Sequence, residues 1–178
     1  RPSDTCPWRP AYYVSHRRER MSAVAITPEP RIRSMHWEDL PAVLRIEELA
    51  YEFPWTLSIF RDCLRVGYAC CVLEAPSGVI GYGLMSVGAG ECHLLNICVH
   101  PEYQRRGLGA RLVEHLLAEA QRRGVRMALL EVRVSNTAAY CLYQKLGFDE
   151  VGLRKDYYPA RQGREDAILL ARELHIWA

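Results

Sequence analysis

One stretch of the chain has apolar side chains at clear helical spacing. They recur on one face of a helix that begins after Gly107. Gly124, which follows Arg122 and Arg123, indicates the end of this helix. This pattern predicts an amphipathic helix from about residue 108 to 123. Shorter helices are predicted over residues 38–50, 57–64 and 136–146. The apolar positions of the main helix are Leu108, Leu112, Val113, Leu116, Leu117 and Ala120.

Alternating and β-rich apolar runs predict strands before, between and after these helices. A short strand begins at Arg31, and turn residues at 76–78 join the next two strands into a hairpin. Because strands and helices are mixed without an internal repeat, we expect one domain of α/β (α+β) class over residues 31–174, followed by a short tail at 175–178. The remaining strands are expected at 68–74, 79–87, 92–99, 127–134, 148–153 and 167–174.

Residues 1–30 follow a different pattern. They hold five of the ten prolines and a basic cluster at residues 17–20, with no sustained helical or strand period. We interpret them as a disordered or loosely attached segment. Because Met21 with Ser22 and Ala23 resembles a natural start, residues 1–20 are interpreted as an upstream in-frame extension or an expression remnant. A targeting segment is the alternative.

Composition and charge narrow the class of protein. Of the 178 residues, 49% are hydrophobic and 25% charged, which is typical of a globular chain. The net charge of +2 comes from residues 1–20, where five arginines stand against Asp4 and Glu19. The rest of the chain is close to neutral, so nucleic acid is not an expected partner. No apolar run is long enough to span a membrane, so a membrane is not expected as a partner either.

The seven cysteines form no C-x-x-C pair and accompany no cluster of histidines. A zinc site is therefore disfavoured, and no metal is expected. Most of the cysteines lie in apolar surroundings, where a thiol behaves as a small buried hydrophobic group. We infer a reducing, cytoplasmic compartment.

A glycine-containing loop precedes the main helix and is the first candidate site. Two glycines allow close approach to the backbone, and the first N–H groups of the helix are free to hold an anion. The loop does not match a dinucleotide fingerprint, because Leu112 replaces its last glycine, and the chain has no Gly-Lys-Ser/Thr of a P-loop. An ordinary glycine turn is the alternative. The loop with its flanks comprises Gln104, Arg105, Arg106, Gly107, Leu108, Gly109 and Ala110.

The remaining pattern, Gln/Arg-x-x-Gly-x-Gly/Ala, resembles the GNAT superfamily of N-acetyltransferases. Further segments match in order at 96–101, 130–132, Asn136 and 139–148. The segments 53–55, 130–136, 157–159 and 163–167 are similar to the RimI branch, whose members acetylate the N-terminal alanine of a small-subunit ribosomal protein in bacteria. The resemblance covers about residues 31–174 and implies a mixed central sheet, splayed between two parallel strands and flanked by helices.

The resemblance also implies how acetyl-coenzyme A, the co-substrate, is bound. The loop would hold its pyrophosphate, and the main chain of the strand at 97–99 would pair with the pantetheine arm. Asn136 would contact the coenzyme, although its position before a helix equally suits an N-cap. The coenzyme-binding residues expected are Ile97, Cys98, Val99, Arg105, Arg106, Gly107, Leu108, Gly109, Ala110 and Asn136.

Two residues are candidates for proton transfer. Glu131 lies in an apolar run, where a carboxylate is costly unless it faces a polar cleft or has a partner. The alternative to a catalytic role is a carboxylate at a strand end that pairs with Arg133 or another surface arginine. The phenol of Tyr143 stays protonated at neutral pH and suits a proton donor, although helix packing also explains it. The resemblance implies that Glu131 is the general base, acting directly or through water, and that Tyr143 protonates the leaving thiolate.

The acceptor is expected to be the N-terminus of a ribosomal protein, entering as an extended peptide. Trp55 and Tyr158 are the candidate contacts, Tyr158 in a segment that reads as a loop. The carboxylates of Glu48, Glu52 and Asp166 are further candidates to attract a basic peptide. We expect direct transfer in a ternary complex. The alternatives are a ping-pong route through Cys98, a lysine or small-molecule acceptor, and a non-catalytic acyl-coenzyme A binding module.

Overall fold

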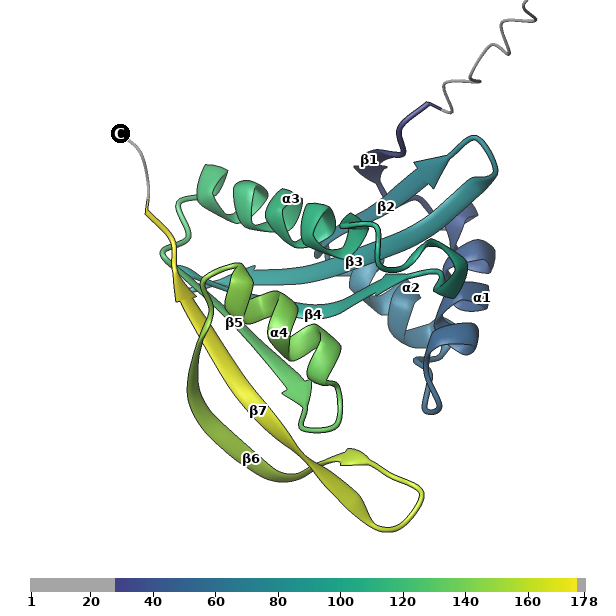
Figure 1. Ribbon diagram of the computed structural model, residues 1–178. Helices are drawn as coiled ribbons and strands as arrows, with labels where there is room; N and C mark the ends of the chain where they lie inside the picture. Colours follow the sequence, from purple (N-terminus) through teal and green to yellow (C-terminus); the bar gives the residue numbers. More distant parts are fainter. Residues whose placement is uncertain (1–27, 176–178) are drawn as a thin grey trace, which may run out of the picture.

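The computed structural model describes residues 28–175, so the expectations for residues 1–27 and for the end of the tail, 176–178, lie outside it. Its centre is a seven-stranded sheet in the order β1-β2-β3-β4-β5-β7-β6 (Figure 1). Neighbouring strands are antiparallel except for β4 and β5, which are parallel. The strands are β1 (Arg31–Ser34), β2 (Ala69–Ala75), β3 (Gly78–Gly88), β4 (Glu91–Val99), β5 (Met127–Arg133), β6 (Asp149–Pro159) and β7 (Arg164–Glu173).

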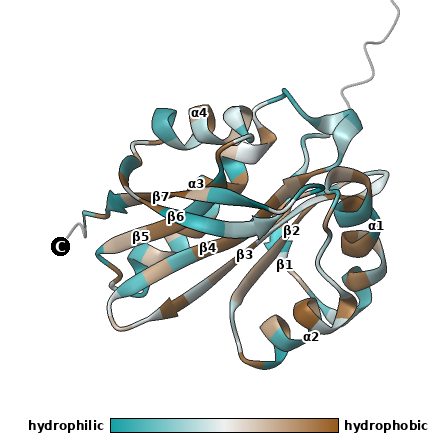
Figure 2. Ribbon diagram, turned by 90° about the horizontal axis from the view of Figure 1, so that it is seen from below, coloured by the Kyte–Doolittle hydropathy of each residue, from teal (hydrophilic) through white to brown (hydrophobic). Residues whose placement is uncertain are grey.

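Two pairs of helices cover the sheet from opposite sides. Figure 1 shows α3 and α4 on one face and α1 and α2 on the other. Figure 2 shows hydrophobic residues concentrated along the central strands, between these layers. None of the helices in the described part of the chain is long and apolar enough to cross a membrane. The helices are α1 (Leu40–Ala50), α2 (Leu57–Arg65), α3 (Leu108–Arg122) and α4 (Thr137–Lys145), with short 3-10 turns at η1 (Trp37–Asp39) and η2 (Pro101–Tyr103).

Each layer has its own hydrophobic core. On the α3/α4 face, the apolar stripe predicted for the main helix packs on β5 residues such as Leu130 and Val132. On the opposite face, Val43 of α1 and Phe60 of α2 pack on Tyr82 of β3. The sheet is packed between the two cores. The ends of the central strands β4 and β5 therefore have fixed positions.

The sheet opens between its two parallel strands. Strands β4 and β5 pair only from Glu91 with Met127 to Leu94 with Leu130, and both strands continue beyond that point. The predicted α/β fold with a central splay is therefore confirmed. The opening exposes main-chain groups of β4 that a fully paired strand would use.

A β-bulge in β4 lies at the same point. Leu84 of β3 is opposite Asn96 and Met85 is opposite Leu94, so Leu95 is an extra residue. One extra residue reverses the alternation of side chains between the two faces. Leu94 consequently belongs to the α3/α4 core, whereas Cys98 belongs to the α1/α2 core. The bulge also turns Asn96 toward α1.

One local prediction was wrong. The segment Tyr157–Pro159 reads as a loop, but it is the end of β6, because Tyr158 pairs with Glu165 and Pro159 with Arg164 of β7. The pairing is irregular, with a register shift between Arg154 and Tyr158. The proline and the charged, glycine-containing stretch after it are typical of loops, while the long-range pairing that makes a strand leaves no local pattern.

Candidate active site at the splayed strands

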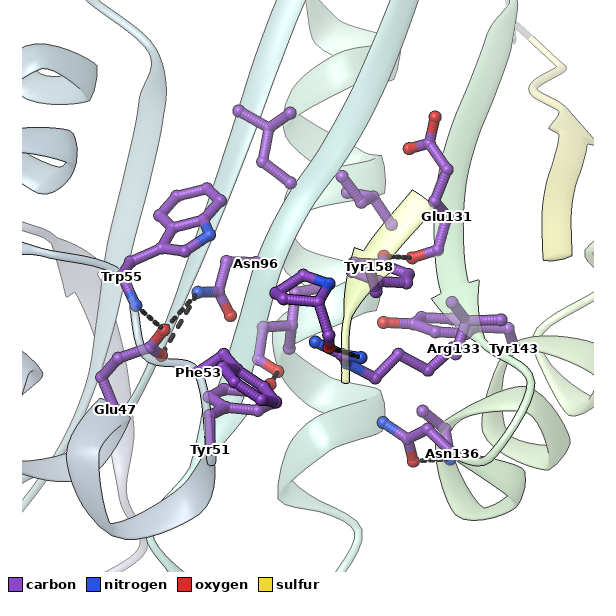
Figure 3. A pocket seen from close by; sticks show the side chains of 16 residues that line it. Glu47, Tyr51, Phe53, Trp55, Asn96, Glu131, Arg133, Asn136, Tyr143 and Tyr158 are labelled. Carbon is purple, nitrogen blue, oxygen red and sulfur yellow. Dashed lines mark hydrogen bonds between the residues drawn. The ribbon is translucent and has the colours of Figure 1, made fainter. Parts of the chain in front are cut away.

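A pocket of about 250 Å³ lies where β4 and β5 separate (Figure 3). Its walls come from the end of α1 and the segment after it, from β4 and β5, from α4, and from the end of β6. The pocket brings together five of the residues singled out in the sequence: Trp55, Glu131, Asn136, Tyr143 and Tyr158. Ile97 also lines it, whereas Cys98, Val99 and the glycine loop do not.

The glycine loop has the geometry of an anion-binding helix start. Gly107 has a φ of 75° and precedes the first residue of α3. The first helical hydrogen bond runs from Arg111 N–H to the Gly107 carbonyl at 3.2 Å, so the N–H groups of Leu108, Gly109 and Ala110 have no partner within the helix. These donors and the positive end of the helix dipole suit a phosphate.

The two arginines of the loop lie at its surface, and Leu108 does not. Arg105 and Arg106 are exposed, and the guanidinium of Arg106 lies 5.2 Å from the ring centre of Tyr103. Leu108 is buried in the core, so its side chain anchors the helix and only its main chain can reach a ligand. A Cβ atom at Gly109 would lie 3.4 Å from a methyl group of Leu142, so this glycine lets α3 and α4 approach closely.

Glu131 is the first residue of β5 beyond the parallel pairing. Its side chain is only 9% exposed; Oε2 lies 2.7 Å from His93 Nε2, and Oε1 lies 3.1 Å from Nη1 of Arg154. Of the partners suggested from the sequence, Arg133 is wrong, because it pairs with Glu165 at 3.1 Å, but the alternative of another surface arginine is confirmed by Arg154. Glu131 therefore has polar partners on β4 and on β6, the strands on either side of the β5–β7 pair, which offset the cost of burying its charge.

Tyr143 lies on the other side of the opening. It belongs to α4, and its ring contacts Phe148 edge-on with centroids 5.8 Å apart. Burial raises the pKa of Tyr143 to about 12, so the phenol is protonated throughout the neutral range. Figure 3 shows its hydroxyl directed into the pocket and the carboxylate of Glu131 directed away from it. Because side chains alternate along β5, Glu131 faces away from the core that contains Leu130.

Asn136 is an N-cap that also lines the pocket. Its Oδ1 accepts a hydrogen bond from the Ala139 N–H at 3.2 Å. The cap uses the oxygen of the amide, and its nitrogen remains available to a ligand in the pocket. The two interpretations of Asn136 from sequence are therefore compatible.

The side of the pocket at Phe53, Trp55 and Tyr158 carries an aromatic wall. The ring of Trp55 lies 5.6 Å from that of Phe60, and the hydroxyl of Tyr158 donates to the main-chain oxygen of Glu131 at 3.1 Å. The guanidinium of Arg133 lies 4.4 Å from the centre of the Tyr158 ring and 5.8 Å from that of Phe53. Burial raises the pKa of Tyr158 above its ordinary value.

The structure does not bring the three expected acidic residues into the pocket lining. Glu48 is exposed on α1, and Glu52 pairs with Arg161. Asp166 accepts a hydrogen bond from the Asp156 N–H at 2.8 Å, so it stabilises the β6–β7 hairpin. Attraction of a basic peptide by these side chains has no support in the geometry.

Cys98 has the environment of an inert thiol. It is 5% exposed, and burial, together with the nearby charge of Glu47, raises its pKa to about 12. Because the thiolate is the nucleophilic form, Cys98 is poorly suited to accept an acetyl group at neutral pH.

Several polar residues of the site were missed in the sequence. Glu47 and Asn96 line the pocket, and His93 and Arg154 hold Glu131. Arg133 also lines the pocket, but it was considered only as a partner of Glu131. Glu47 alone had a local signal, because it falls four residues after Val43 and so on the buried face of α1. The others depend on strand register, which periodicity does not reveal.

Comparisons with known proteins all match acetyltransferases. The model of the Acetyltransferase (GNAT) family matches residues 30–148. A ribosomal protein bS18-alanine N-acetyltransferase of Escherichia coli (strain K12) is 44% identical over 140 residues, which are 79% of this chain and 95% of that protein. The corresponding protein of Haemophilus influenzae is 35% identical over 134 residues, 75% of this chain and 91% of its own length.

Solved structures agree with this result. The crystal structure of the ribosomal-protein-S18-alanine N-acetyltransferase from Escherichia coli matches with a TM-score of 0.78 and 41% identity, covering 84% of this chain and 96% of that one. A phosphinothricin acetyltransferase from Sinorhizobium meliloti, solved with acetyl-coenzyme A, has a TM-score of 0.70 at 22% identity and is similar in fold.

Proposed function

The chain belongs to the acetyltransferase (GNAT) family, and from that premise we propose that it transfers an acetyl group from acetyl-coenzyme A to the N-terminal α-amine of a protein. The substrate is the N-terminal alanine of ribosomal protein bS18, the substrate named for its relatives from Escherichia coli and Haemophilus influenzae. Such a substrate implies a cytoplasmic location.

Acetyl-coenzyme A binds along the opening of the sheet. Its pyrophosphate lies at the free N–H groups that begin α3, with Arg105 and Arg106 beside it. Its pantetheine arm pairs with the main chain of β4 at residues 97–99, where β5 has already separated. Asn136 donates its amide N–H to the coenzyme while its oxygen caps α4.

The chemistry uses one group on each side of the opening. The α-amine attacks the thioester carbonyl carbon, and Glu131 takes the proton from that amine, directly or through water. As the carbon–sulfur bond breaks, the hydroxyl of Tyr143 donates its proton to the departing sulfur. Both substrates are bound at once, so no acetylated enzyme forms, consistent with the high pKa of Cys98.

One observation carries this proposal: the buried carboxylate of Glu131 and the protonated phenol of Tyr143 lie around the gap between β4 and β5. The start of α3, with its free N–H groups, follows β4 in the chain. An acetyl transfer needs a base for the amine, an acid for the thiolate and a site for the coenzyme. Glu131 and Tyr143 lie on the two sides of the opening between β4 and β5, and the start of α3 follows the end of β4 after the short η2 turn.

The test is mass spectrometry of two peptides incubated with the protein and acetyl-coenzyme A. One peptide carries the alanine-initiated N-terminus of bS18, and the other is the same sequence with a blocked α-amine and a free lysine. We expect acetylation of the first alone. Modification of the lysine would transfer the assignment to lysine acceptors, and no reaction with intact coenzyme binding would contradict the proposal.

A further inference from the structure

Glu47 is a buried carboxylate to which the mechanism above gives no role. It lies in the last turns of α1 and is 1% exposed. Among residues 28–175, no lysine, arginine or histidine forms an ion pair with it. Burying a charge without a counter-ion is unfavourable unless hydrogen bonds replace the lost water. The contacts of Glu47 therefore indicate what it does.

All of these contacts are hydrogen bonds from neutral donors. Oε1 accepts from the main-chain N–H of Trp55 at 2.8 Å, and Oε2 accepts from the hydroxyl of Tyr82. The side-chain amide of Asn96 lies 3.3 Å from both oxygens. Figure 3 shows the carboxylate between Trp55 and Asn96 at one end of the pocket. One side chain thus joins α1 to three separate parts of the protein.

Two of these partners lie on different walls of the pocket. Trp55 belongs to the aromatic wall on the acceptor side, and Asn96 is the residue of β4 directly after the bulge. The next residue, Ile97, accepts a hydrogen bond through its main-chain oxygen from the Tyr51 hydroxyl at 3.2 Å. Glu47 and Tyr51 are one helical turn apart, so the end of α1 holds β4 at two consecutive residues.

We propose that Glu47 is a positioning residue that fixes the acceptor wall at Trp55 relative to the thioester-binding part of β4. The proposal rests on the proposed function. Glu47 does not touch the reacting atoms, because its oxygens are occupied by Trp55, Tyr82 and Asn96. Small errors in the position of two reactants lower the rate strongly. Loss of Glu47 should therefore reduce turnover of the peptide without weakening the binding of coenzyme A.

The test compares three variants of the full chain. Glu47→Ala removes every contact, and we expect kcat/KM for the bS18 peptide to fall about ten-fold or more, with the Kd for coenzyme A within two-fold of the original. Glu47→Gln should restore most of the activity, because its oxygen can accept from Trp55 while its amide donates to the Tyr82 oxygen. Tyr82→Phe is the comparison variant, since it removes only the donor on the core side and leaves the contacts to Trp55 and Asn96 in place, so it should lower the Tm and reduce kcat/KM much less than Glu47→Ala does.

Two results would overturn the proposal. One is an unchanged kcat/KM in a folded Glu47→Ala protein. The other is an equal loss of peptide turnover and coenzyme binding in both Glu47→Ala and Tyr82→Phe, which would indicate a purely structural role. If Glu47→Ala does not fold, Asn96→Ala provides the same test, because it breaks the connection to β4 alone, and an unchanged kcat/KM there counts against the proposal. Peptide acetylation by the original protein, run in parallel, separates failure of this inference from failure of the proposed function.

Discussion

Replacing Tyr143 by Phe removes a single hydroxyl group from the pocket. The phenol is protonated at neutral pH, because burial raises its pKa to about 12. No described residue forms a hydrogen bond with the hydroxyl that would be lost, and the edge-on contact with Phe148 uses only the ring. The variant should therefore fold with a Tm close to that of the original protein, and any loss of activity should come from the chemistry.

The size of that loss follows from the leaving group. General acid catalysis typically contributes about 10²–10⁴-fold. A thiol with a reference pKa of about 8.5 leaves readily as a thiolate, so the benefit of protonation should lie near the lower limit. We expect kcat to fall about 10²-fold, equivalent to about 2.7 kcal/mol in activation free energy. The Kd for coenzyme A should change little.

The assay is the initial rate of peptide acetylation at saturating acetyl-coenzyme A, with Tm and coenzyme affinity measured on the same preparations. The ratio of the Tyr143→Phe rate to the rate of the original protein should stay constant between about pH 6 and 9, because a phenol with a pKa of about 12 does not ionise there. A kcat within three-fold of the original would refute the assignment of Tyr143 as the acid. A loss of activity that accompanies a lower Tm would refute the expectation that the variant keeps the ring contact with Phe148 and folds normally.

Two further substitutions test other parts of the site. Cys98→Ala should leave kcat within about three-fold, because the thiol is buried and protonated; a collapse of activity, or an acetyl group trapped on this residue, would favour a ping-pong route. Gly107→Ala places a side chain at a φ of 75°, with no protein atom within 4 Å of the new Cβ. The strain alone should cost about 1 kcal/mol and lower the Tm by about 2–4 °C, measured by thermal denaturation, and an unchanged Tm would show that the loop relaxes without cost.

The main helix and its glycine start were predictable from sequence because their signals are local. The apolar stripe of α3 lies at helical spacing, and Gly107 precedes the helix directly. The end of β6 was not predictable in this way, since Tyr158 becomes part of a strand only by pairing with Glu165. Propensity describes a segment by itself, and pairing with a distant strand can override it.

The partners of the buried carboxylates of Glu131 and Glu47 could not be predicted from local sequence patterns either. His93 and Arg154 reach Glu131 from the two strands that lie to either side of β5 and β7, 38 and 23 residues away in sequence. Asn96 reaches Glu47 because the extra residue Leu95 reverses the alternation of β4. A bulge has no clear signature in the sequence, so an expectation of strict alternation assigns Asn96 to the wrong face.

The most direct test of the account is the rate of acetylation of the bS18 peptide by Glu131→Gln, measured beside the original protein and with coenzyme A affinity determined in parallel. If Glu131 is the base, kcat should fall about 10²–10⁴-fold while the Kd for coenzyme A is unchanged. Acetylation of the free α-amine at the original rate by a folded Glu131→Gln protein would contradict the account.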